Sequence, residues 1–215
     1  MKYLFCGCYE LVSLDLSNFD ISHVTDISHM FYFCRSLEEI NFGNINSSSV
    51  INMGNLFNGC SKLTSIDLSN FDFSHVTDIS YLFSNCYNLE NINFGNINNS
   101  SVQNMRGLFQ SCSQLKSINL SDLDFSNVTD ISYMFYYCNN LETVNFGYIN
   151  TSMVNDMSYL FYICNKLISI DLSNLDFSHV TSMSNMFSYC SKLEQIHFGN
   201  INSVSLKNMK YLFYG

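Results

Sequence analysis

The chain has 215 residues, of which 47% are hydrophobic and 13% are charged, a composition typical of a folded protein rather than a disordered one. Its 18 acidic and 9 basic residues give a net charge of −9 without a cluster of Lys or Arg, which argues against nucleic acid or an anionic membrane as a partner. No apolar run approaches the roughly 20 residues of a membrane span, and residues 1–8 lack the apolar core of a signal peptide.

A period of 26 residues organises the chain from its first residues onward. A phenylalanine column runs from Phe5 to Phe213 at this spacing, and a leucine column runs from Leu11 to Leu193. The cysteine column consists of Cys8, Cys34, Cys60, Cys86, Cys112, Cys138, Cys164 and Cys190. An unbroken period of this length is typical of a solenoid. The period therefore predicts one solenoid domain over residues 1–215, with about eight coils.

The two ends of the chain have the same phase in the repeat. Residues 1–7 match residues 209–215 at six of seven positions, and neither end has the polar capping repeat that solenoids use to stay soluble. We therefore expect a fragment of a longer array that lacks caps, with any targeting signal outside these residues. Uncapped ends also make end-to-end self-association between copies a partner expectation.

Each coil starts with a strand signal and continues with a helix signal. Residues 63–71 (LTSIDLSNF) have the apolar spacing of a leucine-rich repeat strand and its turn. Residues 76–88 (VTDISYLFSNCYN) have apolar side chains at i, i+3, i+4 and i+7, which predicts a short helix capped by Thr77 or Asp78. The expected fold class is a leucine-rich-repeat-like solenoid with one short strand and one short helix per coil and a single parallel sheet.

Two coil types alternate, so the underlying unit is 52 residues long. A serine column alternates with glycine, as in Ser69 and Gly95, and an aspartate column alternates with asparagine, as in Asp72 and Asn98. Asp and Asn in such ladders are typical of turns and caps. Calcium is the alternative, but the glycine-rich nonapeptide of calcium-binding β-rolls is absent and the carboxylates do not gather in one loop, so we expect no metal.

Cysteine and histidine columns raise the question of a metal or catalytic site. Both metal sites and disulfides need paired side chains, and the only close pair is Cys6 and Cys8. The other thiols share the apolar face of the predicted helix, which indicates small, buried, reduced side chains. His23, His75 and His179 recur two coils apart, too far to share a metal ion, and indicate surface turns. We expect no cofactor and no enzymatic activity.

Two regular surfaces remain as candidates for binding. One is the exposed side of the strands, which is small and polar, and the other is an outward column of tyrosines with amphipathic rings suited to interfaces. The strand-side candidates are Ser65, Asp67, Asn91, Asn93, Ser117 and Asn119. The tyrosine candidates are Tyr81, Tyr133, Tyr159 and Tyr211. The alternative is that these tyrosines only cover the helix layer.

The block LTSIDLSNFDFSHVTDISYLFSNC at residues 63–86 returns with few changes at 115–138 and 167–190. It resembles the BspA-like leucine-rich repeat of surface proteins over the whole chain. The alternate coils depart from the pattern, with NFGNIN at residues 93–98 in place of DLSNFD. The resemblance implies a location at the cell surface or outside the cell and a role in adhesion to host proteins or other cells. It fixes no functional residue.

The leading hypothesis is therefore a non-catalytic cell-surface repeat protein that mediates adhesion or binds protein or glycan partners, on host or neighbouring cells, through an extended face. The alternative is a structural or intracellular scaffold for protein–protein interaction. A signal peptide, a lipobox cysteine or a wall anchor in the full-length sequence would favour the first of these.

Overall fold

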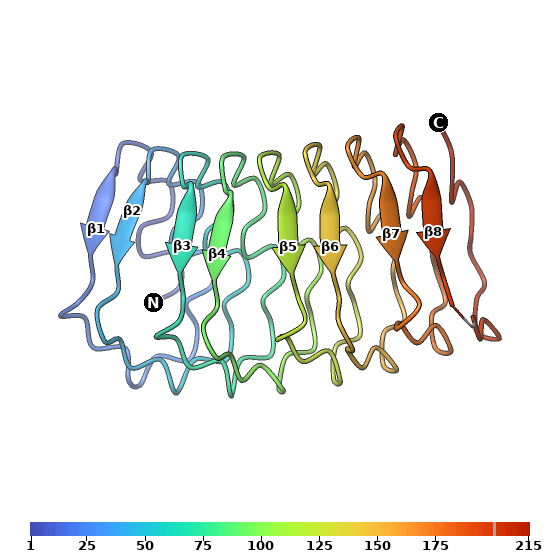
Figure 1. Ribbon diagram of the computed structural model, residues 1–215. Coiled ribbons are helices and arrows are strands. Elements are labelled where there is room, and N and C mark those ends of the chain that lie inside the picture. Colours follow the sequence, from blue (N-terminus) through green and yellow to red (C-terminus); the bar gives the residue numbers. More distant parts are fainter. Residues whose placement is uncertain (200) are drawn as a thin grey trace.

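A computed structural model describes residues 1–199 and 201–215 as a solenoid in which each 26-residue repeat makes one turn (Figure 1). One side of the solenoid carries short strands of three residues each, all parallel. The strands are β1 (Ser13–Asp15), β2 (Glu39–Asn41), β3 (Ser65–Asp67), β4 (Asn91–Asn93), β5 (Ser117–Asn119), β6 (Thr143–Asn145), β7 (Ser169–Asp171) and β8 (Gln195–His197). Eight strands enclose seven full turns, one fewer than the expected number of coils.

The strands pair two by two. Among the described residues, β1 pairs with β2, β3 with β4, β5 with β6 and β7 with β8, so four two-stranded sheets replace the single sheet that the sequence predicted. Gly95 explains the pairing, because its φ is +63° and a Cβ built on it would lie 2.7 Å from the Cβ of Ser69 in the preceding coil. The two coils of a pair therefore approach so closely that only glycine fits. The alternation of Ser and Gly in the sequence is the alternation of close and wide contacts between coils.

A second ladder connects all coils where the chain turns back from the strands. Asp78 bridges both Asn52 and Asn104 in parallel fashion, and the same bridge continues from Asp26 to Asn208. The carboxylate of Asp78 also accepts a hydrogen bond from the backbone N–H of Ser80 at 2.8 Å. The side chain of Asp78 thus stabilises the turn that directly follows the bridge. This ladder maintains the register where the strand pairs separate.

The segment expected to be a helix is a run of stacked β-turns. The N–H of Leu82 donates to the carbonyl of Ile79 at 3.2 Å, three residues back, instead of four as in an α-helix. The N–H of Tyr81 donates to the next coil, to the carbonyl of Arg106 at 2.7 Å. Backbone donors thus alternate between a turn within the coil and a rung between coils. The helix prediction was wrong, and Asp78 begins a turn instead of capping a helix.

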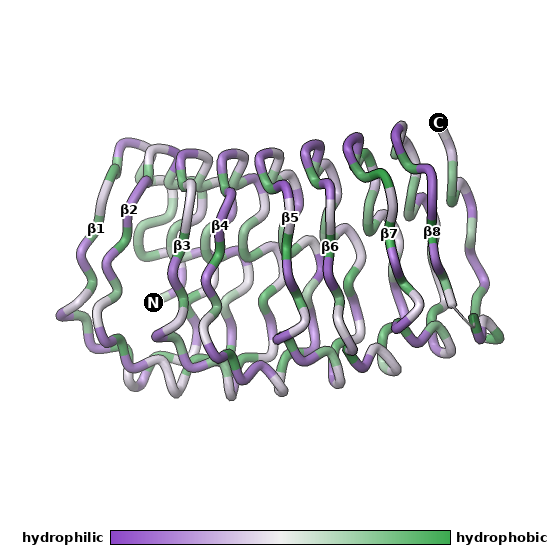
Figure 2. The backbone as a smooth tube through the Cα atoms, in the orientation of Figure 1, coloured by the Kyte–Doolittle hydropathy of each residue, from purple (hydrophilic) through white to green (hydrophobic). Residues whose placement is uncertain are grey.

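The spacing between coils is the physical reason for this difference. Paired strands lie about 4.8 Å apart, whereas packed α-helices need about 8–10 Å. One helix in every coil would bend the solenoid into an arc, and Figure 1 shows the coils in a nearly straight row. Stacked turns keep the same four apolar positions pointing inward at the narrower spacing. Figure 2 shows hydrophilic tips on most of the connections that lead into the strands.

The core consists of stacked columns of identical side chains. The phenylalanine rings from Phe5 to Phe213 stack with centroids 5.5–6.0 Å apart and interplanar angles of 2–16°. Phe109, in the middle of this column, is 0% exposed. In the part of the chain that the structure describes, no helix has the length and apolar character to cross a membrane.

Candidate functional site

The strand-side candidates are all exposed, but their polar atoms are largely used in turns. Asp67 accepts a hydrogen bond from the N–H of Ser69 at 2.8 Å and another from the side-chain amide of Asn93 at 3.1 Å. Asn93 in turn accepts the N–H of Gly95 at 3.0 Å. Asn119 accepts the N–H of Ser121 in the same way. Ser65, Asn91 and Ser117 lie beside them as exposed strand residues.

These contacts confirm that the Asp and Asn ladders build turns. The hydroxyl and N–H of Ser69 stabilise the carboxylate of Asp67 and lower its pKa, and Ser74 does the same for Asp72. Within residues 1–199 and 201–215, no group of three or more His, Cys, Asp or Glu side chains is placed to hold a metal ion. His75 is exposed in a turn, as expected, with the hydroxyl of Ser74 at 3.0 Å from Nδ1.

The cysteine column is buried and reduced from the second coil onward, as the sequence predicted. The thiol of Cys86 donates to the carbonyl of Phe57 in the preceding coil at 3.1 Å, and each thiol from Cys34 to Cys190 makes the equivalent contact. Burial raises the pKa of these thiols, to about 11 for Cys34 and for Cys190. Cys6 and Cys8 in the first coil are exposed.

The four tyrosine candidates lie on the turn layer, and the structure brings only some of them together. Tyr133 and Tyr159 stack with centroids 4.7 Å apart at 14°. Tyr81 lies two coils before Tyr133, because Gly107 occupies the position between them, and its ring covers that glycine. Tyr211 lies two coils after Tyr159 and contacts Tyr214 instead. The four tyrosines share one column in the sequence, but of their rings only those of Tyr133 and Tyr159 contact each other in the described structure. The column is therefore not one continuous strip.

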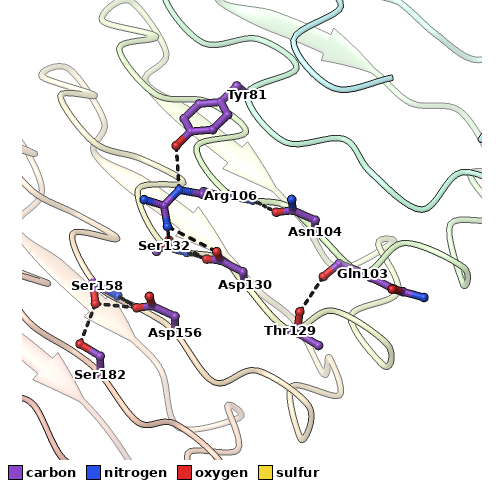
Figure 3. A network of polar contacts seen from close by, with 10 residues as sticks. All are labelled: Tyr81, Gln103, Asn104, Arg106, Thr129, Asp130, Ser132, Asp156, Ser158 and Ser182. Carbon is purple, nitrogen blue, oxygen red and sulfur yellow. Dashed lines mark hydrogen bonds and ion pairs between the residues drawn. The ribbon is translucent and has the colours of Figure 1, made fainter. Parts of the chain in front are cut away.

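Arg106, which was not among the candidates from the sequence, links Tyr81 to Ser132 and Asp130 (Figure 3) and also contacts Tyr133. Its Nε donates to the hydroxyl of Tyr81 at 2.7 Å, and its guanidinium lies 4.5 Å from the ring centroid of Tyr133. One terminal nitrogen donates to the hydroxyl of Ser132 at 2.7 Å and lies 3.4 Å from the carboxylate of Asp130. The signal was present, because Arg106 interrupts a column of Ser and Gly between Ser28 and Ser184.

Tyrosines outside the candidate column extend the contact into a continuous patch. We call this patch the tyrosine face, and it consists of Tyr133, Tyr136, Tyr137, Tyr159, Tyr162 and Tyr189. Tyr136 stacks on Tyr162 at 4.9 Å and 9°, and Tyr162 meets the edge of Tyr189 at 5.6 Å. Tyr137 and Tyr189 are the most exposed members, at 38% and 41%. The rings support one another over three coils.

Every coil has two left-handed backbone positions in the turn layer, and in the coils of the tyrosine face most of these positions carry large side chains. Six residues of these coils are left-handed although they are not glycine, with φ between 55° and 61°. They are Tyr133, Tyr137, Tyr159, Ile163, Asn185 and Tyr189. A left-handed residue with a Cβ costs about 1–2 kcal/mol, and other coils place Gly59, Asn85 or Gly107 at the equivalent positions. Large side chains at these positions therefore make the fold less stable than glycine would.

The tyrosine face is rich in hydrogen-bond donors, and it borders the Arg106 guanidinium at the ring of Tyr133. The segments 131–141, 157–165 and 183–191 contain no Asp, Glu, Lys or Arg. Among the described residues, none of the six hydroxyl groups of the face has a hydrogen-bond partner. Burial, with a smaller effect from neighbouring Tyr137, raises the pKa of Tyr136 to about 12, so this phenol stays protonated at neutral pH. The face can stack against a flat partner and donate to acceptors on it.

The fold and this surface define a non-globular class of protein, a parallel solenoid of short strands and stacked turns with an aromatic outer patch. The chain matches the family described as "Mycoplasma protein of unknown function, DUF285" over residues 1–119 and 105–215. It therefore belongs to that family. No curated protein sequence matches the chain.

Solved structures similar to the chain include leucine-rich repeat proteins of bacteria, the class that the 26-residue repeat resembles. One from Bacteroides ovatus is 19% identical with a TM-score of 0.40, over 98% of this chain and 77% of that one. A leucine-rich cell surface protein from Faecalibacterium prausnitzii is 17% identical with a TM-score of 0.35, over 93% and 76%. An internalin from Listeria monocytogenes is 20% identical with a TM-score of 0.38, over 77% of this chain and 43% of that one, so this chain spans less than half its length.

Proposed function

We propose that this protein is a non-catalytic repeat scaffold of the cell surface that binds protein or glycan partners on host or neighbouring cells through its tyrosine face. The observation that carries the proposal is the continuous set of six tyrosines in mutual ring contact on the layer of turns, whose hydroxyl groups have no partner among the described residues. Large rings with few rotatable bonds supply contact area at a low cost in conformational entropy. The location and the adhesive role follow from the resemblance to BspA-like repeats.

The strand side supports binding less well. Its exposed side chains are small, and Asp67, Asn93 and Asn119 already accept backbone hydrogen bonds that form the following turns. A partner would have to compete with these local contacts. The tyrosine hydroxyls have no such contacts to lose, which favours the turn layer.

Binding of the purified protein to immobilised fibronectin, laminin and mucin tests the proposal. The variant Tyr133→Ser with Tyr159→Ser should lose most of the binding, because it removes the stacked pair at the centre of the face. The control variant Ser117→Ala changes the exposed strand side and should bind like the parent. Equal binding by both variants, or none by the parent, would contradict the proposal. Labelling of intact cells that produce the protein tests its location.

A further inference from the structure

A hollow of about 370 Å³ lies at the edge of the turn layer, in coils that the tyrosine face does not reach. It spans three coils and is lined by Phe33, Arg35, Gly59, Ser61, Asn85 and Tyr87. The hollow exists because its middle coil contributes only Gly59 and Ser61, whereas the outer coils contribute larger side chains. A Cβ built on Gly59 would overlap the ring of Phe33, so this ring lies directly over the middle coil. Sites for small molecules begin at about 300 Å³, so the hollow suits one small ligand unit.

Arg35 provides a positive charge in a fixed place beside the hollow. Its guanidinium lies 5.3 Å from the ring centroid of Phe33 and 5.3 Å from that of Tyr9, so two rings orient it. In the described part of the chain, its side chain forms no ion pair and donates no hydrogen bond. Arg106 differs, because its donors are used within the fold. The five N–H donors of Arg35 are therefore available to a ligand.

The other lining residues supply an aromatic wall and polar groups without a negative charge. No Asp or Glu is among the six lining residues, so the charge of the hollow is opposite in sign to the net charge of −9 of the whole chain. Tyr87 is 48% exposed, and the negative face of such a ring attracts the polarised C–H groups of a sugar. The hydroxyl of Ser61 donates to the carbonyl of Arg35 at 3.1 Å, which leaves its oxygen able to accept a hydrogen bond.

The charge of the hollow favours a carboxylate over a phosphate. One guanidinium can donate two parallel hydrogen bonds to a carboxylate. A phosphate group carries nearly two charges and is typically bound by a cluster of Arg, whereas the lining contains Arg35 and no second Lys or Arg. The aromatic wall and the acceptor on Ser61 match a sugar ring that carries the carboxylate.

We propose that this hollow binds a carboxylate-bearing sugar unit of a glycan, with the carboxylate on Arg35 and the sugar ring against Tyr87. The site is separate from the tyrosine face, so the inference does not rest on binding there. Because the interaction joins opposite charges at an exposed position, binding weakens as the salt concentration rises.

Titration of the protein with sialyllactose, with a hyaluronan tetrasaccharide and with lactose, followed by NMR of the ligand, tests the inference. We expect saturable binding of an acidic sugar and none of lactose, which lacks the carboxylate. Arg35→Gln should weaken the binding roughly tenfold or more, because a hydrogen bond to a charged group is lost. Tyr87→Ser should also weaken it, whereas Tyr87→Phe keeps the ring and should retain most of the affinity. The control variant Lys166→Gln removes the same charge from an exposed position in a distant coil and should bind like the parent. Thermal melts establish that all variants fold.

The outcomes separate this inference from the proposed function. Loss of acidic-sugar binding in Arg35→Gln, with full binding by Tyr133→Ser with Tyr159→Ser, supports a second site, and the sugar that binds identifies a sialic or a uronic acid as its source. Equal binding by Arg35→Gln and the parent, equal binding of lactose, or no binding of either acidic sugar would overturn the inference. Tighter binding of inorganic phosphate or of tetraglutamate would overturn it too, because the site would then recognise an anion without a sugar ring. None of these results decides binding at Tyr133 and Tyr159.

Discussion

Removal of one ring from the phenylalanine column should weaken the whole array. Phe109 is 0% exposed and stacks between Phe83 at 6.0 Å and Phe135 at 5.6 Å, so Phe109→Ala leaves a cavity and breaks two ring contacts. Such a change costs about 3–5 kcal/mol. For a chain of this size each kcal/mol lowers Tm by about 2–4 °C, so the expected fall is roughly 6–20 °C. Calorimetry and urea titration measure it.

The same column provides a matched control. Phe213 is 57% exposed and stacks on one ring only, that of Phe187 at 5.7 Å, so Phe213→Ala should cost about 1 kcal/mol. Hydrogen exchange should locate the damage in Phe109→Ala at the N–H of Phe83, which donates to the neighbouring coil at 3.0 Å. A Phe109→Ala variant that melts with the parent, or that loses no more than Phe213→Ala, would refute the argument that the coils are stabilised collectively.

Four other predictions follow from the turns and the core. Gly95→Ala should lower the free energy of unfolding by roughly 2–4 kcal/mol, because the left-handed backbone and the contact with the neighbouring coil both reject a Cβ; an unchanged urea midpoint would contradict the close approach. Ser111→Gly should raise stability by about 1 kcal/mol, since Ser111 has φ +61°, whereas the control Ser113→Gly should lower it in the same titration. Tm should stay constant down to about pH 5 and fall as the pH drops below about 4, because the carboxylates whose folded pKa is lowered stabilise the fold only while ionised; Asp67→Asn should reduce this loss, and an identical acid profile would count against the assignment. A thiol reagent should label the 2 exposed cysteines of the folded protein and reach the 7 buried ones only after unfolding, which a timed mass measurement checks.

Much of the core was predictable from the sequence, because an unbroken period fixes which side chains stack. The columns that contain Phe109 and Cys86 are buried as expected, and the strands fall within the segments predicted for them. The alternation of Ser69 and Gly95 was visible as a 52-residue unit, but its meaning was not. A pattern of residue types does not give the distance between the backbones of neighbouring coils. This distance, short at each Ser–Gly contact, determines which strands pair.

The candidate site was predicted in composition but not in arrangement. Tyr133 and Tyr159 stack as neighbours in one column, whereas Tyr81 joins them only through Arg106. Contacts between columns, such as Tyr162 with Tyr189, depend on how far each coil rises and on the left-handed backbone that aims each ring. The spacing of residues along the chain predicts neither the rise of each coil nor the direction of each ring.

The sequence by itself determined the solenoid, the members of each stacked column and the absence of charge between residues 131 and 141. Only the tertiary structure decided between a helix and a run of turns, since the apolar spacing of Ile79, Leu82, Phe83 and Cys86 fits both. Hydrogen bonds from every second N–H to the next coil, at a spacing too narrow for helices, settle that choice.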